Sequence, residues 1–335
     1  MKRSAALGKV GALFVLAVLC GGGPAALPVT PAAAGSAVPL DVGLSFDNIA
    51  AVPLWLGIDQ HLFERYGVQP TLITIRGGTQ AMAAMVSGRL PILFTAGVTI
   101  IEPVVKGIPI ELVAGLVNVI PYDFITAPEI TKPSQLEGAR GGISGFGSAD
   151  YYAQIYALGL LHVDPKRVVW LQIGTETERL AALKAKQIQF TILIVGMDTP
   201  ALAAGFQPML RLYETKQPFQ HATVAVYKPW ADTHRAELTS FLKGLIASIV
   251  YWKDPAHTSE VLAVAMKHLH MSSEDLQPGL ALYREKIIPT YPLVTGAGME
   301  FLLKMVQVNR RATDFYDNSY VEALQAENFA ATVGR

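Results

Sequence analysis

The residues best suited to hold a small molecule lie in a glycine-containing loop, Gly145-Phe146-Gly147-Ser148. This loop joins an expected strand over residues 140–144 to an expected helix over residues 151–161. Glycines let the backbone approach a ligand closely, and the first N–H groups of a helix have no partner within the helix. Together with the helix dipole, these groups suit a carboxylate, sulfonate or nitrate oxygen. The alternative interpretation is that Ser148 only caps its own helix.

Loops that follow other expected strands supply the remaining candidates. In open parallel sheets a ligand lies beyond the carboxyl ends of the strands, so these loops are expected to face it. The ligand-binding residues expected from this rule are Phe46, Asp47, Asn48, Gly78, Thr79, Thr95, Ala96, Gly97, Phe146, Gly147, Ser148, Tyr151, Thr175, Gly196, Met197 and Asp198.

Some of these side chains, and one neighbouring cation, have two interpretations each. Phe46 and Phe146 could stack on a flat ligand or cover the core. Asp47 and Asp198 could bind an amine or make Asx turns. Arg76, beside a first-half loop, could pair with an anion or stay solvated.

The sequence offers little that is typical of a metal site or of catalysis. The seven histidines are scattered, and no H-E-x-x-H, G-x-S-x-G, Walker or dinucleotide-binding motif is present. The single cysteine, Cys20, can form neither an internal disulfide nor a multi-cysteine metal site. We therefore predict no catalytic residue, no metal ligand and no cofactor. Carboxylate-only catalysis stays open, because carboxylate pairs are recognised by geometry.

Composition and the first residues indicate an exported protein. Apolar residues make up 51% of the chain and charged residues 16%, with 27 basic and 27 acidic side chains, so no net charge favours nucleic acid. Lys2, Arg3 and Lys9 precede an uncharged run over 10–19, and residues 32–34 offer an A-x-A cleavage site. We predict a signal peptide over residues 1–34 and a periplasmic or extracytoplasmic location. A lipid anchor on Cys20 is less favoured because Leu19 precedes it, and an uncleaved membrane anchor is a further alternative.

Strand-like and helix-like stretches alternate from residue 40 onward. Strands are expected at 40–46, 68–75, 92–95, 110–117, 140–144, 168–173, 190–195, 209–213 and 223–227. Helices are expected at 49–65, 80–87, 100–106, 151–161, 176–186, 200–204, 235–252, 258–268, 273–285, 298–309 and 319–327. This order implies parallel sheets covered by helices.

A weak internal repeat suggests two similar halves. Residues 83–85 and 92–94 are echoed by residues 181–183 and 190–192, 98 positions later. We expect one lobe formed by residues 38–120 plus 222–335 and a second lobe over 121–221. The chain would cross between them near 117–122 and 217–223.

The order of several motifs resembles a known family. Leu40-Asp41-Val42-Gly43, then Leu62-Phe63-Glu64-Arg65-Tyr66-Gly67-Val68, then Gly77-Gly78 and Gly88 resemble the periplasmic nitrate/sulfonate/taurine solute-binding proteins and their thiamine-precursor relatives. The second half continues the pattern with Gly141-Gly142, Gly147-Ser148 and Glu178-Arg179-Leu180-Ala181-Ala182-Leu183. The chain departs from the family after each alanine-rich helix. Residues 88–91 and 186–189 lack the acid that usually stands there.

The resemblance implies a type II periplasmic-binding-protein fold, with two α/β lobes joined by a two-crossing hinge and a helical C-terminal stretch. It also implies a monomeric receptor of an ABC importer that delivers a small anionic or heteroaromatic solute to a permease and its ATPase. Sulfonate, nitrate, carboxylate and pyrimidine are the ligand classes implied. Known enzymes on this scaffold depend on cysteine, which a chain cleaved near residue 34 would lack. The alternatives are a cysteine-free lyase or hydrolase and an exported sensor module.

Overall fold

The computed structural model describes residues 37–75 and 77–334. The predicted signal peptide with Cys20 and the candidate cation Arg76 lie outside the described residues. No helix in the described part of the chain combines the length and the apolar character needed to cross a bilayer.

Five strands form the first sheet, in the order β2-β1-β3-β10-β4. They are β1 Val38–Leu44, β2 Val68–Thr74, β3 Ile92–Thr95, β4 Ile110–Val119 and β10 Pro218–Tyr227. β1 runs parallel to β2 and β3, whereas β10 runs antiparallel to β3 and β4.

Five further strands form the second sheet, in the order β7-β6-β8-β5-β9. They are β5 Tyr122–Thr126, β6 Arg140–Ile143, β7 Val169–Gln172, β8 Phe190–Ile194 and β9 Gln207–Arg211. β6 is parallel to β7 and β8, and β5 is antiparallel to β8 and β9. The two sheets therefore share one topology, in which β6, β7 and β8 correspond to β1, β2 and β3.

Both sheets are mixed, so the expectation of purely parallel sheets is wrong. The chain leaves the first sheet along β4 and returns to it along β10, and the two strands must run in opposite directions. Pro218 at the start of β10 lies opposite Val119 at the end of β4. Alternating strands and helices could not reveal this reversal, nor the unpredicted strand β5.

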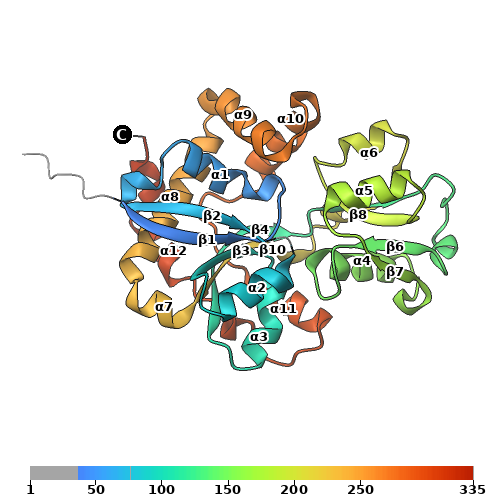
Figure 1. Cartoon of the computed structure of the whole chain (residues 1–335), viewed down its shortest axis with the longest axis horizontal. Helices are drawn as coiled ribbons and strands as arrows, with labels where there is room; N and C mark the ends of the chain where they lie inside the picture. The colour runs from blue at the N-terminus through green and yellow to red at the C-terminus, as the bar shows by residue number, and fades with distance from the viewer. Residues whose placement is uncertain (1–36, 76, 335) are drawn as a thin grey trace, which may run out of the picture. The chain divides into compact units, whose positions relative to one another are not determined.

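Helices lie on both sides of each sheet (Figure 1). They are α1 Val52–Asp59, α2 Gly78–Val86, α3 Ile101–Val105, α4 Ala149–Leu160, α5 Glu176–Lys184, α6 Thr199–Ala203, α7 Lys228–Thr233, α8 Arg235–Lys253, α9 Thr258–Leu269, α10 Ser273–Leu282, α11 Gly296–Met305 and α12 Ser319–Ala326. The expected helix 49–65 is shorter, because α1 ends at Asp59 and His61 adopts a positive φ of 53°. The expected helix 273–285 continues beyond Leu282 as a π-helical turn, Tyr283–Ile287.

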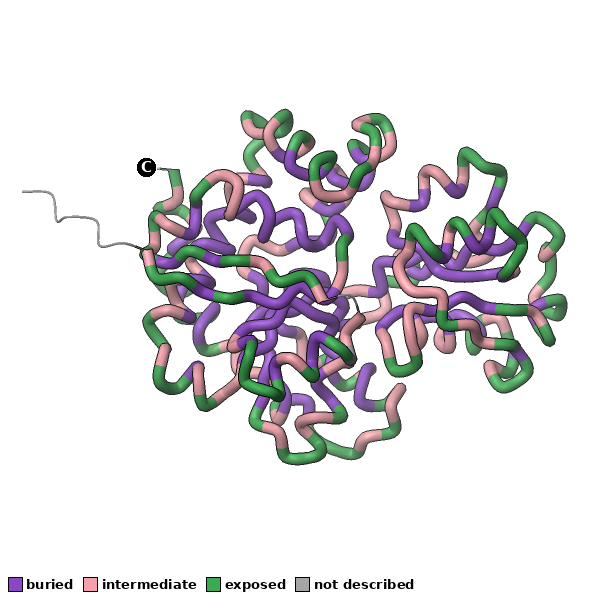
Figure 2. Tube along the Cα trace, viewed as in Figure 1, coloured by how far each residue is buried: buried purple, intermediate pink, exposed green. Residues whose placement is uncertain are grey.

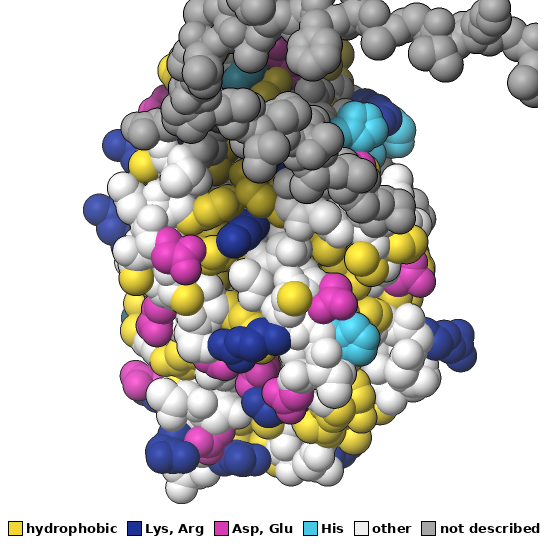
Figure 3. All heavy atoms as spheres, turned by 90° about the vertical axis from the view of Figure 1, so that its left-hand side faces the viewer, with side chains coloured by type: hydrophobic (Ala, Val, Ile, Leu, Met, Phe, Trp, Pro, Cys, Tyr) yellow, Lys and Arg dark blue, Asp and Glu magenta, His cyan; other side chains and the backbone are white. Residues whose placement is uncertain are grey.

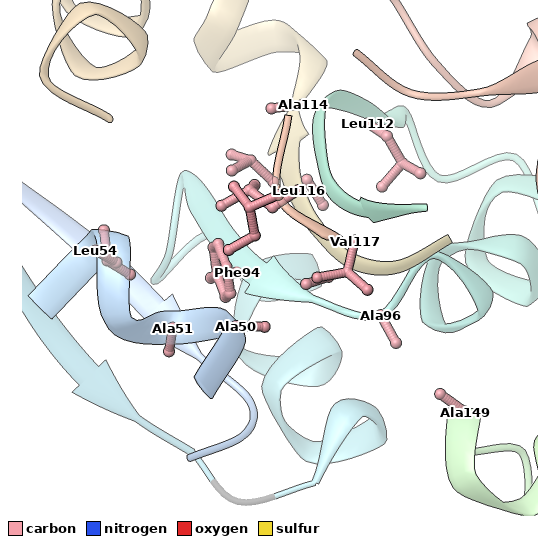
Figure 4. Close-up of a cluster of buried hydrophobic side chains, with 14 of the residues drawn as sticks. Ala50, Ala51, Leu54, Phe94, Ala96, Leu112, Ala114, Leu116, Val117 and Ala149 are labelled. Atoms are coloured by element: carbon pink, nitrogen blue, oxygen red, sulfur yellow. The ribbon is translucent and has the colours of Figure 1, made fainter. Parts of the chain in front are cut away.

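Most buried apolar side chains belong to one cluster that includes all five strands of the first sheet (Figure 2). Figure 4 shows part of it, with Phe94, Ala114 and Leu116 close together and Ala149 of α4 near its edge. A smaller cluster on the other side of the second sheet contains Ile125, Leu183, Ile188 and Phe206. On the face drawn in Figure 3, basic and acidic side chains are mixed, in keeping with the zero formal charge.

Replacement of Gly244 by alanine should destabilise the protein. A Cβ on Gly244, in α8, would overlap the fully buried ring of Phe63. Overpacking of this kind costs about 1–3 kcal/mol, which exceeds the gain in helix propensity. Gly159→Ala is the matched control, because Gly159 also lies in a helix but a Cβ there meets nothing within 4 Å. Urea unfolding should show Gly244→Ala less stable and Gly159→Ala unchanged or up to about 1 kcal/mol more stable. Equal effects would contradict the packing described here.

Candidate ligand-binding site

The loops at the carboxyl ends of both sheets line one cavity of about 730 Å³. The first sheet contributes the loops after β1, β2 and β3, and the second sheet contributes those after β6, β7 and β8. Tyr122 of β5, His221 of β10 and residues 268–271 at the end of α9 also belong to the lining. A separate cavity of about 470 Å³ lies between α8, α9 and α10 and is lined largely by apolar groups.

More than half of the candidate residues line the larger cavity. Those that do are Phe46, Asp47, Asn48, Gly78, Thr95, Ala96, Ser148, Thr175 and Met197. Those that do not are Gly97, Phe146, Gly147, Tyr151, Gly196 and Asp198. The side chain of Thr79 lies outside the described residues. Contact between any of these residues and a ligand stays a prediction.

A row of three hydroxyl groups forms part of the first sheet's wall. Thr99 Oγ1 donates to the carbonyl of Ala96 at 2.5 Å, so its single proton is used there. Thr95 Oγ1 therefore donates to Thr99 Oγ1 at 2.9 Å, and Ser45 Oγ donates to Thr95 Oγ1 at 3.0 Å. All three protons are committed within the protein, and the remaining capacity of the row is lone pairs.

The carboxylate of Asp150 lies at the N-terminus of α4 and accepts hydrogen bonds from the groups around it. The Ser144 amide donates to Oδ2 at 2.7 Å, and both the Ser144 and the Ser148 hydroxyls contact Oδ1, the latter at 2.5 Å. Ser148 also caps the helix, since its Oγ accepts from the Tyr151 amide at 3.2 Å. The capping alternative is therefore observed, and the carboxylate at this helix start belongs to the protein itself.

Arg179 lies buried beside Asp150, with 3.7 Å between Nη1 and Oδ2. Its Nη1 donates to the Gly174 carbonyl at 2.6 Å and its Nε to Thr191 Oγ1 at 3.1 Å. Nη2 contacts the Ile192 carbonyl at 3.4 Å. Each guanidinium nitrogen thus has a partner within the protein.

A second carboxylate, that of Glu176, lines the cavity in the first turn of α5. Burial raises the pKa of Glu176 to about 7. Arg179 and the Ile194 amide, which donates to Oε2 at 3.3 Å, both lower that pKa but do not restore it. The N-cap of α5 is Thr175, whose Oγ1 accepts from the Glu178 amide at 3.3 Å, and Glu178 Oε2 accepts in return from the Thr175 amide at 2.6 Å and from Thr175 Oγ1 at 2.9 Å.

His221 forms a buried aromatic wall together with Phe46 and Tyr122. Its ring stacks on Phe46 at 5.5 Å between centroids and meets the edge of Tyr122 at 5.1 Å. Nδ1 lies 3.3 Å from the Tyr122 hydroxyl, and Nε2 has no partner within the described structure. Burial lowers the pKa of His221 to about 3, so the imidazole is neutral at physiological pH.

Several candidates outside the lining have structural roles. Phe146 is 54% exposed and packs against the edge of Tyr151. Gly196 has a φ of 86° and contacts Gly279 of α10, where an added Cβ would lie 2.6 Å from the Gly196 carbonyl oxygen. The second sheet's β8–α6 loop therefore packs directly on a C-terminal helix.

Asp198 is buried near a second buried carboxyl group, Asp123 of β5. Arg211 Nη1 donates to Asp123 Oδ2 at 3.1 Å, and Asp198 Oδ1 accepts from the Gly196 amide at 3.0 Å. Burial, together with the negative charge of Asp198, raises the pKa of Asp123 to about 7, although Arg211 opposes the shift. Asp198 therefore interacts with the Gly196 amide and with Asp123 and does not line the cavity.

Sequence reasoning missed Glu176, Arg179, His221 and the 268–271 segment. Glu176 and Arg179 stand among other charged residues and resemble a solvated helix face, although Thr175 and Glu178 carry the spacing of a capping box. His221 lies inside a strand whose start was placed too late. Among residues 37–75 and 77–334, no three His, Asp or Glu side chains are grouped as a metal site would require.

Two sheets of equal topology, joined by β4 and β10 and sharing a cavity at their carboxyl ends, define the periplasmic-binding-protein fold expected from the sequence. A family model described as "NMT1/THI5 like" matches residues 48–256, more than half of the chain. The chain belongs to this NMT1/THI5-like family.

Solved structures share the fold at low sequence identity. The ligand-binding component of an ABC-type import system from Staphylococcus aureus, with zinc bound, has a TM-score of 0.70 and 15% identity over 85% of this chain and 98% of that one. The alkanesulfonate-binding protein SsuA from Xanthomonas axonopodis pv. citri, bound to MOPS, has a TM-score of 0.67 and 12% identity over 86% and 98%. The desulfurization enzyme DSZB has a TM-score of 0.63 and 12% identity over 87% and 99%. A comparison with curated protein sequences finds no significant match.

The Asp123 carboxyl group should make stability depend on pH. Its pKa is about 7 in the folded protein and 3.8 in an unfolded chain, so the folded state holds the extra proton between these values. Stability from this group is therefore present at low pH and lost as pH rises toward 7. Relative to the parent, Asp123→Asn should gain roughly 2–4 kcal/mol between pH 4 and pH 8 in urea unfolding. Asp232→Asn, at an exposed position, is the control, and a pH-independent effect of Asp123→Asn would contradict the burial argument.

Proposed function

We propose that the chain is the extracytoplasmic solute-binding receptor of an ABC importer. It captures a small molecule and presents it to a permease with its ATPase. The observation that carries the proposal is the single cavity to which both sheets contribute the loops after three of their strands. Its volume, about 730 Å³, lies in the range typical of small-molecule sites.

The names of several structures with this fold support the proposal. The Staphylococcus aureus protein is a component of an ABC-type import system, and the Xanthomonas protein binds alkanesulfonates. DSZB is an enzyme on the same fold, so the fold alone does not decide between binding and catalysis.

The chemistry of the cavity favours binding over catalysis. The Ser45 hydroxyl donates to a threonine, and the Ser144 hydroxyl donates to Asp150. Ser148 contacts Asp150 and the Gly145 carbonyl. These hydroxyls are held by acceptors and not by an imidazole base, so among the described residues of the lining no serine is paired with a histidine as in an activated nucleophile. We therefore propose that the protein is not an enzyme.

The finer parts of the proposal concern location, assembly and ligand. Residues 1–34 are the signal peptide that directs export, and the mature protein acts as a monomer. The boundaries between its two lobes lie near residues 120 and 221. Sulfonates, nitrate, carboxylates and pyrimidines are the solutes to test first.

When a panel of candidate solutes is screened, the solute that binds should raise the melting temperature of the purified mature protein. A solute present at 100 times its Kd adds about 2.7 kcal/mol of stability, which shifts the Tm by several degrees for a protein of this size. Mass spectrometry of small molecules released on denaturation identifies a solute that co-purifies. Chemical turnover of a panel member would favour a cysteine-free enzyme. If the protein binds a solute but cells take up that solute equally well without the protein, a sensor module would be favoured.

A further inference from the structure

On the first sheet's wall of the cavity, a row of hydroxyl groups has its protons directed into the protein. The protons of Ser45, Thr95 and Thr99 pass along one row to the Ala96 carbonyl, so these hydroxyls can only accept from a ligand. Across the cavity, the Ser144 hydroxyl is committed to Asp150. The protons of these four hydroxyls are thus already paired within the described part of the chain.

Two carboxylates of the protein, Asp150 and Glu178, lie in the first turns of α4 and α5, the helices that reach the cavity from the second sheet. Asp150 takes the Ser144 amide and hydroxyl at the start of α4. Glu178 takes the Thr175 amide and hydroxyl at the start of α5. An external anion would lie beside these negative charges, which disfavours its binding at either helix.

The charged side chains of the lining have an excess of acid. Among the described residues that line the cavity, four are acidic, namely Asp47, Asp150, Glu176 and Glu178, and Arg179 is the one lysine or arginine. The Arg179 guanidinium is shared by Asp150, Thr191 and two backbone carbonyls, so little of its charge faces a ligand. Asp47 from the first sheet is exposed, and Glu176 from the second accepts from the Ile194 amide in addition to its charge interaction with Arg179.

An unpartnered polar atom lies on the aromatic wall of the same cavity. His221 is 2% exposed and lines the cavity, and its Nε2 has no partner in the described part of the chain. A buried polar nitrogen without a partner costs free energy, which a ligand recovers by pairing with it. The ring of Phe46, stacked on His221, offers a flat apolar surface beside that atom.

We propose that the solute carries a protonated nitrogen, as in an amine or amidine, attached to a flat ring. The cationic group pairs with Glu176 and Asp47, and the ring lies against Phe46 and His221. This inference rests on the receptor function and narrows its ligand to a cation, whereas sulfonate, nitrate or carboxylate binding is the competing outcome.

Three planar molecules of nearly equal shape test the charge preference. Benzamidine, benzamide and benzoate carry charges of +1, 0 and −1 and are titrated calorimetrically into the mature protein at pH 8. Nitrate and ethanesulfonate extend the anionic arm. We expect benzamidine to bind at least 10-fold more tightly than benzamide, with benzoate weakest, because a charge-assisted hydrogen bond is stronger than a neutral one.

Glu176→Gln tests the partner of the cation. We expect benzamidine to bind about 10- to 100-fold more weakly to this variant, with little change for benzamide. Glu300→Gln, at an exposed position of α11 outside the cavity, should bind all three molecules as the parent does. Near-identical unfolding midpoints for the two variants would show that Glu176→Gln acts on binding and not on folding.

Proton exchange gives a second readout that does not depend on affinity. Glu176 is near its pKa at neutral pH, and a bound cation favours its ionised form. Benzamidine should therefore release protons on binding at pH 6.5, and an anion should take them up. Glu176 interacts with Arg179 on its own helix, Asp150 of α4, Asp198 before α6, Tyr122 of β5 and Tyr283 after α10. If Glu176→Gln no longer releases protons when it binds benzamidine, the proton released by the parent protein comes from Glu176 and not from these groups or the cavity histidines.

The outcomes separate the two proposals. Preference for benzoate, nitrate or ethanesulfonate would overturn the cation inference and leave the receptor function intact. Absence of binding by all five molecules at 10 mM would also overturn it, and the co-purified solute would then decide the receptor function. Turnover of a bound molecule would overturn the receptor function itself.

Discussion

The antiparallel pairing of β4 with β10 is the constraint on which the rest of the structure depends. These strands take the chain from the first sheet to the second and bring it back, so their directions must be opposite. The pairing runs from Ile110 opposite Tyr227 to Val119 opposite Pro218, and it is irregular near the crossing. Because the two sheets share one strand order, their carboxyl-end loops meet the same cavity. His221, near the start of β10, lies at the cavity for the same reason.

Carboxylates organise the second sheet's contribution to the cavity. Asp150 holds the β6–α4 loop through Ser144 and Ser148, and its charge is balanced in part by Arg179 of α5. Arg179 in turn contacts carbonyls that follow β7 and lie within β8. A network of this kind links three loops of the sheet, and a change in any member is felt by the others. The negative groups that line the cavity therefore also hold its loops in place.

Local pattern was enough to predict most elements of the fold, although not β5 or α7, and most of the loops that carry the site. The strands expected to end at Phe46, Ile75 and Ser144 gave the loops in which many lining residues lie. Strand direction could not be predicted, because it depends on where the chain returns to the first sheet. Within the β6–α4 loop, the α4 N-cap turns Ser148 toward the cavity and leaves Phe146 exposed, a distinction set by backbone conformation. Glu176, Arg179 and His221 were missed because their burial arises from packing against other strands.

The row of hydroxyls from Ser45 to Thr99 has a direction, and that direction is set at its far end. The Ala96 carbonyl receives the last proton, which orients each donor before it. A side chain without a hydroxyl at position 99 would release the proton of Thr95 and let it turn toward the cavity. Replacing the Thr99 hydroxyl by a methyl group would thus change this wall from one that only accepts hydrogen bonds into one that can also donate one. The electrostatic character of this wall is in this sense decided by the Thr99 hydroxyl at the end of the row.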